Sequence, residues 1–387
     1  MNSDFLLYIL VISIFNTALS QIISGMGFFD EFLVVLILTY AINRRDFILS
    51  REVKFCIGIF IFYLIYSLAM AVNVKEATIR DFLICSKPFV CFYAAQYYGM
   101  DFSDSAINRC RGIVKMMGVC LWLMAPFISQ LYFNTTHYYP ACAYTGMLYL
   151  LLSDYSKKDW IIATFILLPG LLSIRAKFFA EFVLWIFIAF FLKRRIKFNF
   201  SFLIIGAVLF YIIYRINYDK IMMYTVNGLD EGAARTYLYL TSFEVFRDFF
   251  PLGPGFGTFA TDSAAKFYSP LNYQYGLNSI YGLNPDDEVA GTSFYSDTFY
   301  PLLAQFGFIG ALLFFLFFKK RWSDGRFLED DQRYKLFLFS FVYILIQCIA
   351  ENTFTGANGL PIMLIIGLTL SDNQLQYEDS EYYEQDR

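Results

Sequence analysis

Long apolar stretches alternate with short polar ones along most of the chain. They recur at residues 5–23, 30–43, 54–73, 81–99, 112–132, 140–153, 159–173, 178–192, 199–216, 295–318, 334–350 and 358–371. A helix needs about 20 apolar residues to cross the hydrocarbon core of a bilayer. The pattern therefore predicts an all-α polytopic membrane protein with about 12 transmembrane helices.

One hydrophilic segment, residues 217–294, interrupts this rhythm between the ninth and tenth predicted helices. Within it, apolar residues at helical spacing predict an amphipathic helix over 233–249. A glycine-rich turn follows at 251–257, and Thr258 is placed to cap a short helix through Ala265. The chain is thus divided into helices 1–9 (1–216), a large loop (217–294), helices 10–12 (295–371) and an acidic tail (372–387).

Composition supports a lipid environment. Hydrophobic residues make up 58% of the chain and charged residues 16%, whereas soluble domains have about 25% charged residues. A soluble enzyme or secreted domain is therefore excluded. The net charge of -3 is too small to indicate nucleic-acid binding. The seven cysteines lie mostly in or beside apolar runs and contain no C-x-x-C pair, so we interpret them as small buried hydrophobic residues.

The distribution of basic residues predicts the orientation of the chain in the membrane. With the N-terminus in the cytoplasm, the strongest basic clusters, 193–197 and 319–321, fall on the same side. Short cytoplasmic loops carry an excess of Lys and Arg, so both termini are predicted to be cytoplasmic and the large loop external. No basic residue precedes the first apolar stretch, which favours a retained helix over a cleaved signal peptide.

Few basic residues fall on the predicted outer side, and those few are candidates for anion binding. They are Arg175, Lys177, Arg235 and Arg247. Arginine suits phosphate through its bidentate fork, although snorkelling or topology anchoring remains the alternative. The turn that contains Gly255 and Gly257 can present backbone N–H groups to an anion, or it can be a turn that merely needs glycine.

Acidic residues and the single histidine supply candidates for a general base. Asp297 falls at the mouth of the tenth predicted helix, and Glu231 and His137 lie in predicted outer segments. A carboxylate at such a depth is costly unless it is used or paired, and Glu351, at the end of the eleventh helix, is similar. The sequence has no His/Cys/Asp cluster at metal-ligand spacing and no nucleotide-binding glycine motif.

Taken in order, several segments resemble the superfamily of bacterial O-antigen polymerases (Wzy-type) and O-antigen ligases. The similar segments are LSIR ending at Arg175, Arg235 followed by PLGPGFGTF at 251–259, and Ser296-Asp297 followed by QFGFIG at 305–310. The plan of helices with one large late loop also matches. Ligases carry a His-Asn pair where this chain has Ser296 and Asp297, so the departure favours a polymerase.

The resemblance implies a GT-C-like fold and a glycosyltransferase that faces the periplasm from the bacterial inner membrane. Such an enzyme joins undecaprenyl-pyrophosphate-linked repeat units without a metal or other cofactor, and a chain-length-regulating co-polymerase is a possible partner. Arg175, Lys177, Arg235, Arg247, Gly255 and Gly257 would bind the pyrophosphate, and Asp297, Glu231 or His137 would be the base. A ligase that transfers glycan to lipid A-core, a flippase or other secondary transporter, and a non-catalytic scaffold or sensor remain alternatives.

Overall fold

The computed structural model describes residues 4–19, 29–43, 49–99, 102–127, 135–192, 232–287, 294–295 and 298–371, with single residues at 211, 215, 218, 222 and 228. The predicted helix at 199–216, most of segment 217–231 and the acidic tail therefore lie outside the description, as do Glu231 and Asp297. Within the described ranges every regular element is a helix. The predicted all-α class is thus confirmed for this part of the chain.

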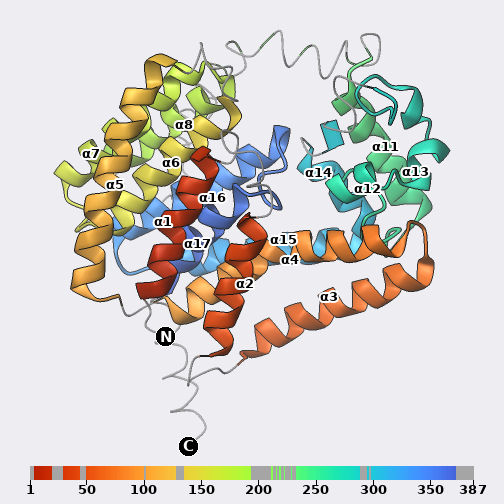
Figure 1. Ribbon diagram of the computed structural model, residues 1–387, viewed down its shortest axis with the longest axis horizontal. Coiled ribbons are helices and arrows are strands. Elements are labelled where there is room, and N and C mark those ends of the chain that lie inside the picture. The colour runs from red at the N-terminus through yellow and green to blue at the C-terminus, as the bar shows by residue number, and fades with distance from the viewer. Residues whose placement is uncertain are drawn as a thin grey trace, which may run out of the picture.

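The first half of the chain forms eight helices (Figure 1). They are α1 (Asp4–Leu19), α2 (Phe29–Ile42), α3 (Arg51–Met70), α4 (Lys75–Tyr98), α5 (Asp104–Met124), α6 (Thr135–Leu151), α7 (Lys157–Leu167) and α8 (Ala176–Ile186). Turns of other helical pitch extend α5, α7 and α8 as η2 (Ala125–Phe127), η3 (Leu168–Ser173) and η4 (Phe187–Phe191). Serine side chains cap three of these helices: Ser50 for α3, Ser103 for α5 and Ser156 for α7.

The second half begins with a group of six helical elements in the described residues and ends in three further helices. The first group comprises α11 (Ala234–Asp248), α12 (Asp262–Lys266), α13 (Pro270–Gln274), η5 (Leu277–Ser279), α14 (Phe299–Leu302) and η7 (Leu303–Phe306). The three further helices are α15 (Gly307–Arg326), α16 (Asp331–Ala350) and α17 (Gly359–Thr369). A helix, α11, occupies the range predicted for the amphipathic helix, although Phe243 of the predicted apolar face is 71% exposed. The short helix after the glycine turn starts later than predicted, because Thr261 rather than Thr258 caps it.

Helix α17 forms the centre of the core. All of its residues are buried, as expected for a helix that is apolar on every side. It packs most extensively on α4, where Gly367 lies so close that a Cβ atom there would come within 2.5 Å of the Phe92 carbonyl oxygen. It also packs on α1, α6 and α16.

Among the described residues, three helical segments are long and apolar enough to cross a membrane: 51–70, 104–127 and 299–326. Two shorter apolar helices cover 4–17 and 359–369. On α3, large apolar side chains such as Phe55, Ile61 and Ile65 are exposed, as a lipid-facing surface requires. The chain is therefore a membrane protein, and its regular structure in the described ranges is helical.

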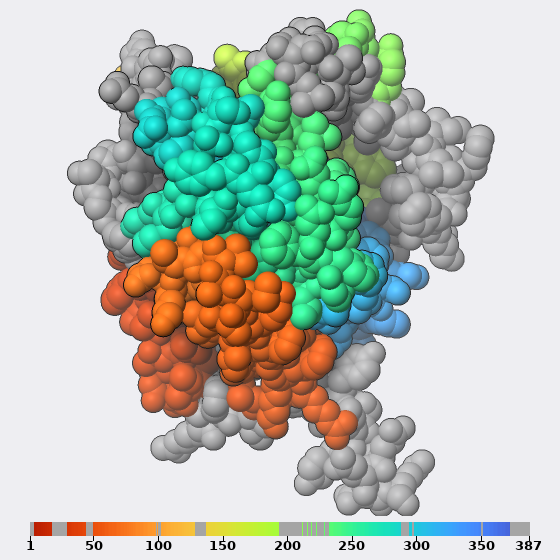
Figure 2. Space-filling view, turned by 90° about the vertical axis from the view of Figure 1, so that its right-hand side faces the viewer, coloured from red at the N-terminus to blue at the C-terminus, as the bar shows by residue number. Residues whose placement is uncertain are grey.

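The group α11–α13 packs against the α3–α4 hairpin. Figure 2 shows residues 232–287, in green to cyan, resting on this hairpin in orange. Hydrogen bonds join the two parts: Tyr66 donates to the Gly253 carbonyl at 2.8 Å and Asn73 donates to the Gly257 carbonyl at 2.6 Å. Arg80 pairs with Asp262 at 2.6 Å. This seating fixes the position of α11 relative to the helical bundle.

Candidate functional site

Three of the predicted anion-binding residues stand at helix beginnings. Arg175 is the N-cap residue of α8 and Lys177 is in its first turn. Arg235 is in the first turn of α11. The N-terminus of a helix carries partial positive charge and unsatisfied N–H groups, so it favours an anion. Each helix therefore combines two sources of attraction for the same kind of ligand.

The C-terminal end of α16 brings these helix beginnings together. Lys177 Nζ forms an ion pair with Glu351 Oε1 at 2.8 Å, directly after α16. Tyr239, one turn after Arg235, donates to the Ile349 carbonyl at 2.8 Å. Figure 1 shows α16 between α6 and α8 on one side and α11 and α14 on the other. The structure thus places α8 and α11 on opposite sides of one helix end.

A buried polar network lies beneath the ion pair. The Tyr139 hydroxyl lies 3.0 Å from Gln347 Oε1 and 3.2 Å from both carboxylate oxygens of Glu351. A phenol has one proton, so Tyr139 shares it between these acceptors. Gln347 in turn donates to Glu181 Oε1 at 2.7 Å. Glu181 is fully buried, and charged groups inside a membrane bundle are rare and usually functional.

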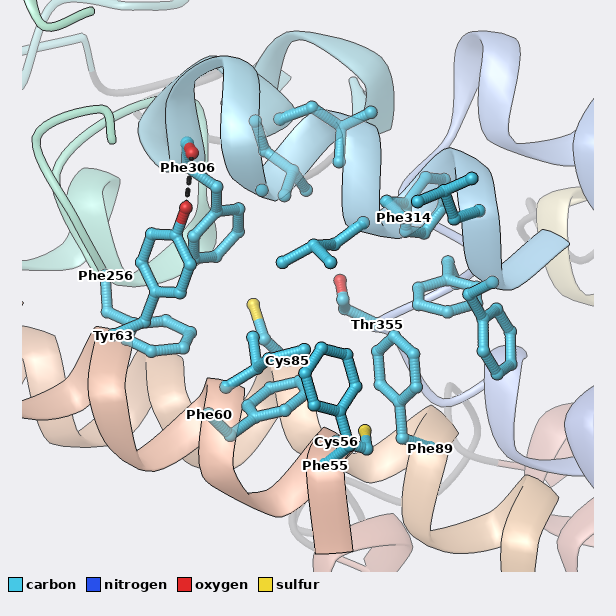
Figure 3. Close-up of a pocket in the computed structure, with 18 of the residues that line it drawn as sticks. Phe55, Cys56, Phe60, Tyr63, Cys85, Phe89, Phe256, Phe306, Phe314 and Thr355 are labelled. Atoms are coloured by element: carbon cyan, nitrogen blue, oxygen red, sulfur yellow. Dashed lines mark hydrogen bonds between the residues drawn. The ribbon is translucent and has the colours of Figure 1, made fainter. Parts of the chain in front are cut away.

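An apolar cavity of about 280 Å³ lies between α3, α4, η7 and α15 (Figure 3). Most of the residues in its wall are phenylalanine, leucine and isoleucine, including Phe60, Phe89 and Phe314. Phe55 and Leu316 line the cavity and are also exposed on the surface, so the cavity opens between α3 and α15. Such a chamber suits a hydrocarbon chain.

The two ends of the cavity differ. At one end, Glu52 pairs with Lys320 and with the buried Arg321, whose guanidinium also lies over the rings of Phe92 and Phe317. Tyr63, Phe256 and Phe306 line the other end (Figure 3). Phe354 and Thr355 also line the wall, within four residues of Glu351. The polar network and the apolar cavity are therefore neighbours.

His137 lies in the first turn of α6, two residues before Tyr139. Residues at this spacing do not face the same side of a helix, so His137 points away from the direction of Tyr139. The described structure gives it no contact with Glu351 or Lys177. Asp297 and Glu231, the other predicted bases, lie outside the described residues.

Arg247 does not belong to this site, which corrects the prediction. It lies twelve residues from Arg235 on α11, a separation of about 18 Å along a helix axis. Its side chain is 77% exposed and pairs with Asp248 at 2.9 Å. Hydrogen bonding to Arg247 lowers the pKa of Asp248. The two arginines therefore cannot hold one pyrophosphate.

Gly255 and Gly257 are structural, which corrects their predicted role as an anion cradle. Their N–H groups donate to the Gln305 carbonyl and to Asp81 Oδ2, both at 2.8 Å. The N–H groups between and after them donate to Ser67 Oγ and Gln305 Oε1. With four successive donors engaged inside the protein, the turn has none left for a ligand.

The structure adds three residues that the sequence analysis did not single out, Tyr139, Glu181 and Gln347. Glu181 carried a usable signal, because it is a carboxylate inside the apolar stretch 178–192. Tyr139 and Gln347 carried none, since neutral polar residues are common in apolar helices. Within the described ranges, no three His, Cys, Asp or Glu side chains are grouped closely enough to share a metal ion.

In the part of the chain that the structure describes, fold and site define a helical membrane protein with a polar network beside an apolar cavity. Comparison with known families, with curated proteins and with solved structures gives no match.

Proposed function

We propose that this protein is a surface-polysaccharide polymerase of the bacterial inner membrane. It joins undecaprenyl-pyrophosphate-linked repeat units on the periplasmic side through a GT-C-like arrangement of about 12 transmembrane helices with both termini in the cytoplasm. Reporter fusions at the C-terminus test this orientation, and a periplasmic signal there would contradict it.

One observation carries the proposal. The basic first turns of two helices, α8 and α11, lie on opposite sides of the end of α16, and this end is close to an apolar cavity. A polyprenyl pyrophosphate has the matching chemistry, since it joins a doubly charged anion to a long hydrocarbon. The basic residues would therefore bind the pyrophosphate of the donor, and the apolar cavity would bind its hydrocarbon chain.

The residues at this site account for the charge that develops during glycosyl transfer. As the bond between the sugar and the pyrophosphate breaks, negative charge grows on the leaving oxygen. Arg175, Lys177 and Arg235, which lie at helix N-termini, stabilise this charge. The proton of the acceptor hydroxyl needs a base, for which Asp297, Glu231 and His137 are the candidates from the sequence.

A gene deletion with complementation tests the proposal on a lipopolysaccharide or polysaccharide gel. We expect the deletion to leave core with a single repeat unit, and wild type to restore the ladder. Arg235→Ala should fail to restore it, whereas Arg247→Ala, on the same helix but exposed and paired with Asp248, should restore it. Equal polymer from the two variants would contradict the pyrophosphate role of Arg235.

The same experiment separates the alternatives. Bare core with lipid-linked polymer accumulating inside would indicate a ligase, which uses the same donor with another acceptor. Unchanged surface glycan would favour a secondary transporter. One observation supports transport as the second candidate: Lys87 in α4 pairs with Asp30 at 2.5 Å and with Glu31 at 3.1 Å, and charged clusters within helical bundles are typical of ion pathways.

A further inference from the structure

The ion pair between Lys177 and Glu351 lies close to the protein surface, with the Lys177 Nζ atom itself enclosed. The two side chains keep 18% and 17% of their surface exposed. Glu351 directly follows α16, and the loop after it runs to Phe354 and Thr355 on the cavity wall. An anion that contacts Lys177 Nζ must therefore open this ion pair.

Lys177 cannot satisfy two anions equally. A lysine ammonium is a compact point charge on a flexible stem, and a pyrophosphate carries more negative charge than one carboxylate. Binding of the donor therefore draws Lys177 away from Glu351. Glu351 keeps its second partner, because the Tyr139 hydroxyl lies 3.2 Å from both of its oxygens.

We propose that Glu351 is the catalytic base of the transfer and that donor binding releases it by taking over Lys177. This inference rests on the proposed polymerase function. Glu351 then takes the role of base for which Asp297, Glu231 and His137 were the candidates from the sequence.

A lone pair of the acceptor hydroxyl oxygen forms a bond to the anomeric carbon of the donor sugar. The bond from that carbon to the pyrophosphate oxygen breaks, and its electron pair leaves with the pyrophosphate, next to Lys177. The hydroxyl proton passes to Glu351, which has acceptor sites beyond the one that Tyr139 occupies. After the pyrophosphate departs, Glu351 loses this proton to water and pairs with Lys177 again.

The network behind Glu351 has a positioning role. Tyr139 contacts Glu351 directly, and Gln347 ties Tyr139 to the buried Glu181. These contacts come from α6, α8 and α16, so three helices hold the carboxylate while its partner changes. Precise placement of this kind is what a proton transfer at hydrogen-bond distance requires.

Two measurements on the full-length protein test the inference. In the deletion strain, Glu351→Gln should restore no ladder, Glu351→Asp should restore part of it, and Glu244→Gln, an exposed glutamate on α11, should restore all of it. In lipid nanodiscs, purified Glu351→Gln should bind undecaprenyl pyrophosphate about tenfold more tightly than wild type, because Lys177 no longer has a competing carboxylate. Lys177→Met should bind this probe more weakly.

Each contrary result has a distinct meaning. A full ladder from Glu351→Gln, with none from Asp297→Asn, would assign the base to Asp297 and overturn the inference. Equal or weaker probe binding by Glu351→Gln would overturn the exchange of partners and leave Glu351 a structural role. If the deletion leaves surface glycan unchanged, the polymerase function itself fails, whereas the binding measurement still reports on the exchange.

Discussion

At the scale of residues, each buried polar group of the candidate site has few hydrogen-bond partners, so the stability of the site is sensitive to the loss of any one of them. Tyr139 serves both Glu351 and Gln347 with a single proton, and Gln347 alone contacts Glu181 among the described hydrogen bonds. A buried group that loses its partner has a desolvation cost of about 1 to 3 kcal/mol. Removing one hydroxyl should therefore affect the whole network.

Tyr139→Phe tests this dependence. The ring still fills its place beside Phe178, but Gln347 Oε1 loses its donor and Glu351 loses a contact to both oxygens. We expect the variant to unfold with a free energy about 1 to 3 kcal/mol lower than wild type, measured by thermal unfolding in detergent. Tyr281→Phe, which changes a 63% exposed tyrosine, is the control, and equal loss in both variants would count against the network.

Sequence analysis located part of this site. Lys177 and Arg235 stood out because basic residues are rare on the predicted outer side, and the structure places both near the end of α16. Gly255 and Gly257 stood out as glycines of a tight turn, and their φ angles are positive, 96° and 71°. Their N–H groups, however, bond to other parts of the protein and not to a ligand. A sequence cannot distinguish these uses, because the acceptors come from α3, α4 and η7.

At the scale of elements, the glycine turn joins the segment α11–α13 to the α3–α4 hairpin. Gly257 has a φ of +71°, and a Cβ atom there would lie 2.7 Å from the Ala77 carbonyl oxygen of α4. Gly276 has nearly the same φ, +69°, with nothing within 4 Å of such an atom. Comparing these two glycines therefore separates the strain of a left-handed residue from the cost of a steric clash with α4.

Gly276→Ala should cost only the left-handed penalty of about 1 to 2 kcal/mol. Gly257→Ala should cost clearly more, because the backbone of α4 must shift and the bond to Asp81 is weakened. Denaturant unfolding of the purified variants measures both, and the membrane level of each protein gives a second reading. If the two substitutions cost the same, the close approach to α4 does not contribute to stability.

Helix boundaries show where sequence patterns stop being sufficient. The tenth predicted helix, 295–318, instead comprises α14 and η7, then α15 from Gly307 to Arg326. Gly307 has a φ of +57°, which separates the first part from the second. The helix continues past 318 through charged residues because Arg321 is buried against Glu52 and two phenylalanine rings. These partners lie on other helices, so no local pattern predicts them.

At the scale of the whole molecule, the cavity between α3 and α15 opens where the surface is apolar. Phe55, one of the side chains at its mouth, is 62% exposed. Under the proposed function, the hydrocarbon of the donor occupies this chamber while its pyrophosphate lies near Lys177. Filling the cavity should then reduce polymer without disturbing the polar network.

Leu313→Trp tests this arrangement, because Leu313 lines the cavity. We expect shorter or fainter ladders on the polysaccharide gel at an unchanged level of protein in the membrane. The neighbouring Leu312 is exposed and lies outside the cavity wall, so Leu312→Trp adds the same bulk to the lipid-facing side and should leave the ladder intact. If both variants make normal polymer, the cavity is not needed for the reaction.

The seating of the glycine turn on the α3–α4 hairpin also sets an order of events during synthesis. The partners of Ser67 and Asp81 lie 189 and 176 residues further along the chain. The hairpin therefore leaves the ribosome and enters the bilayer long before the turn that completes it has been translated. Throughout that interval its buried acceptors depend on water or on an insertion chaperone. A nascent chain interrupted before residue 249 would expose them permanently, which gives membrane proteases a means to recognise unfinished molecules.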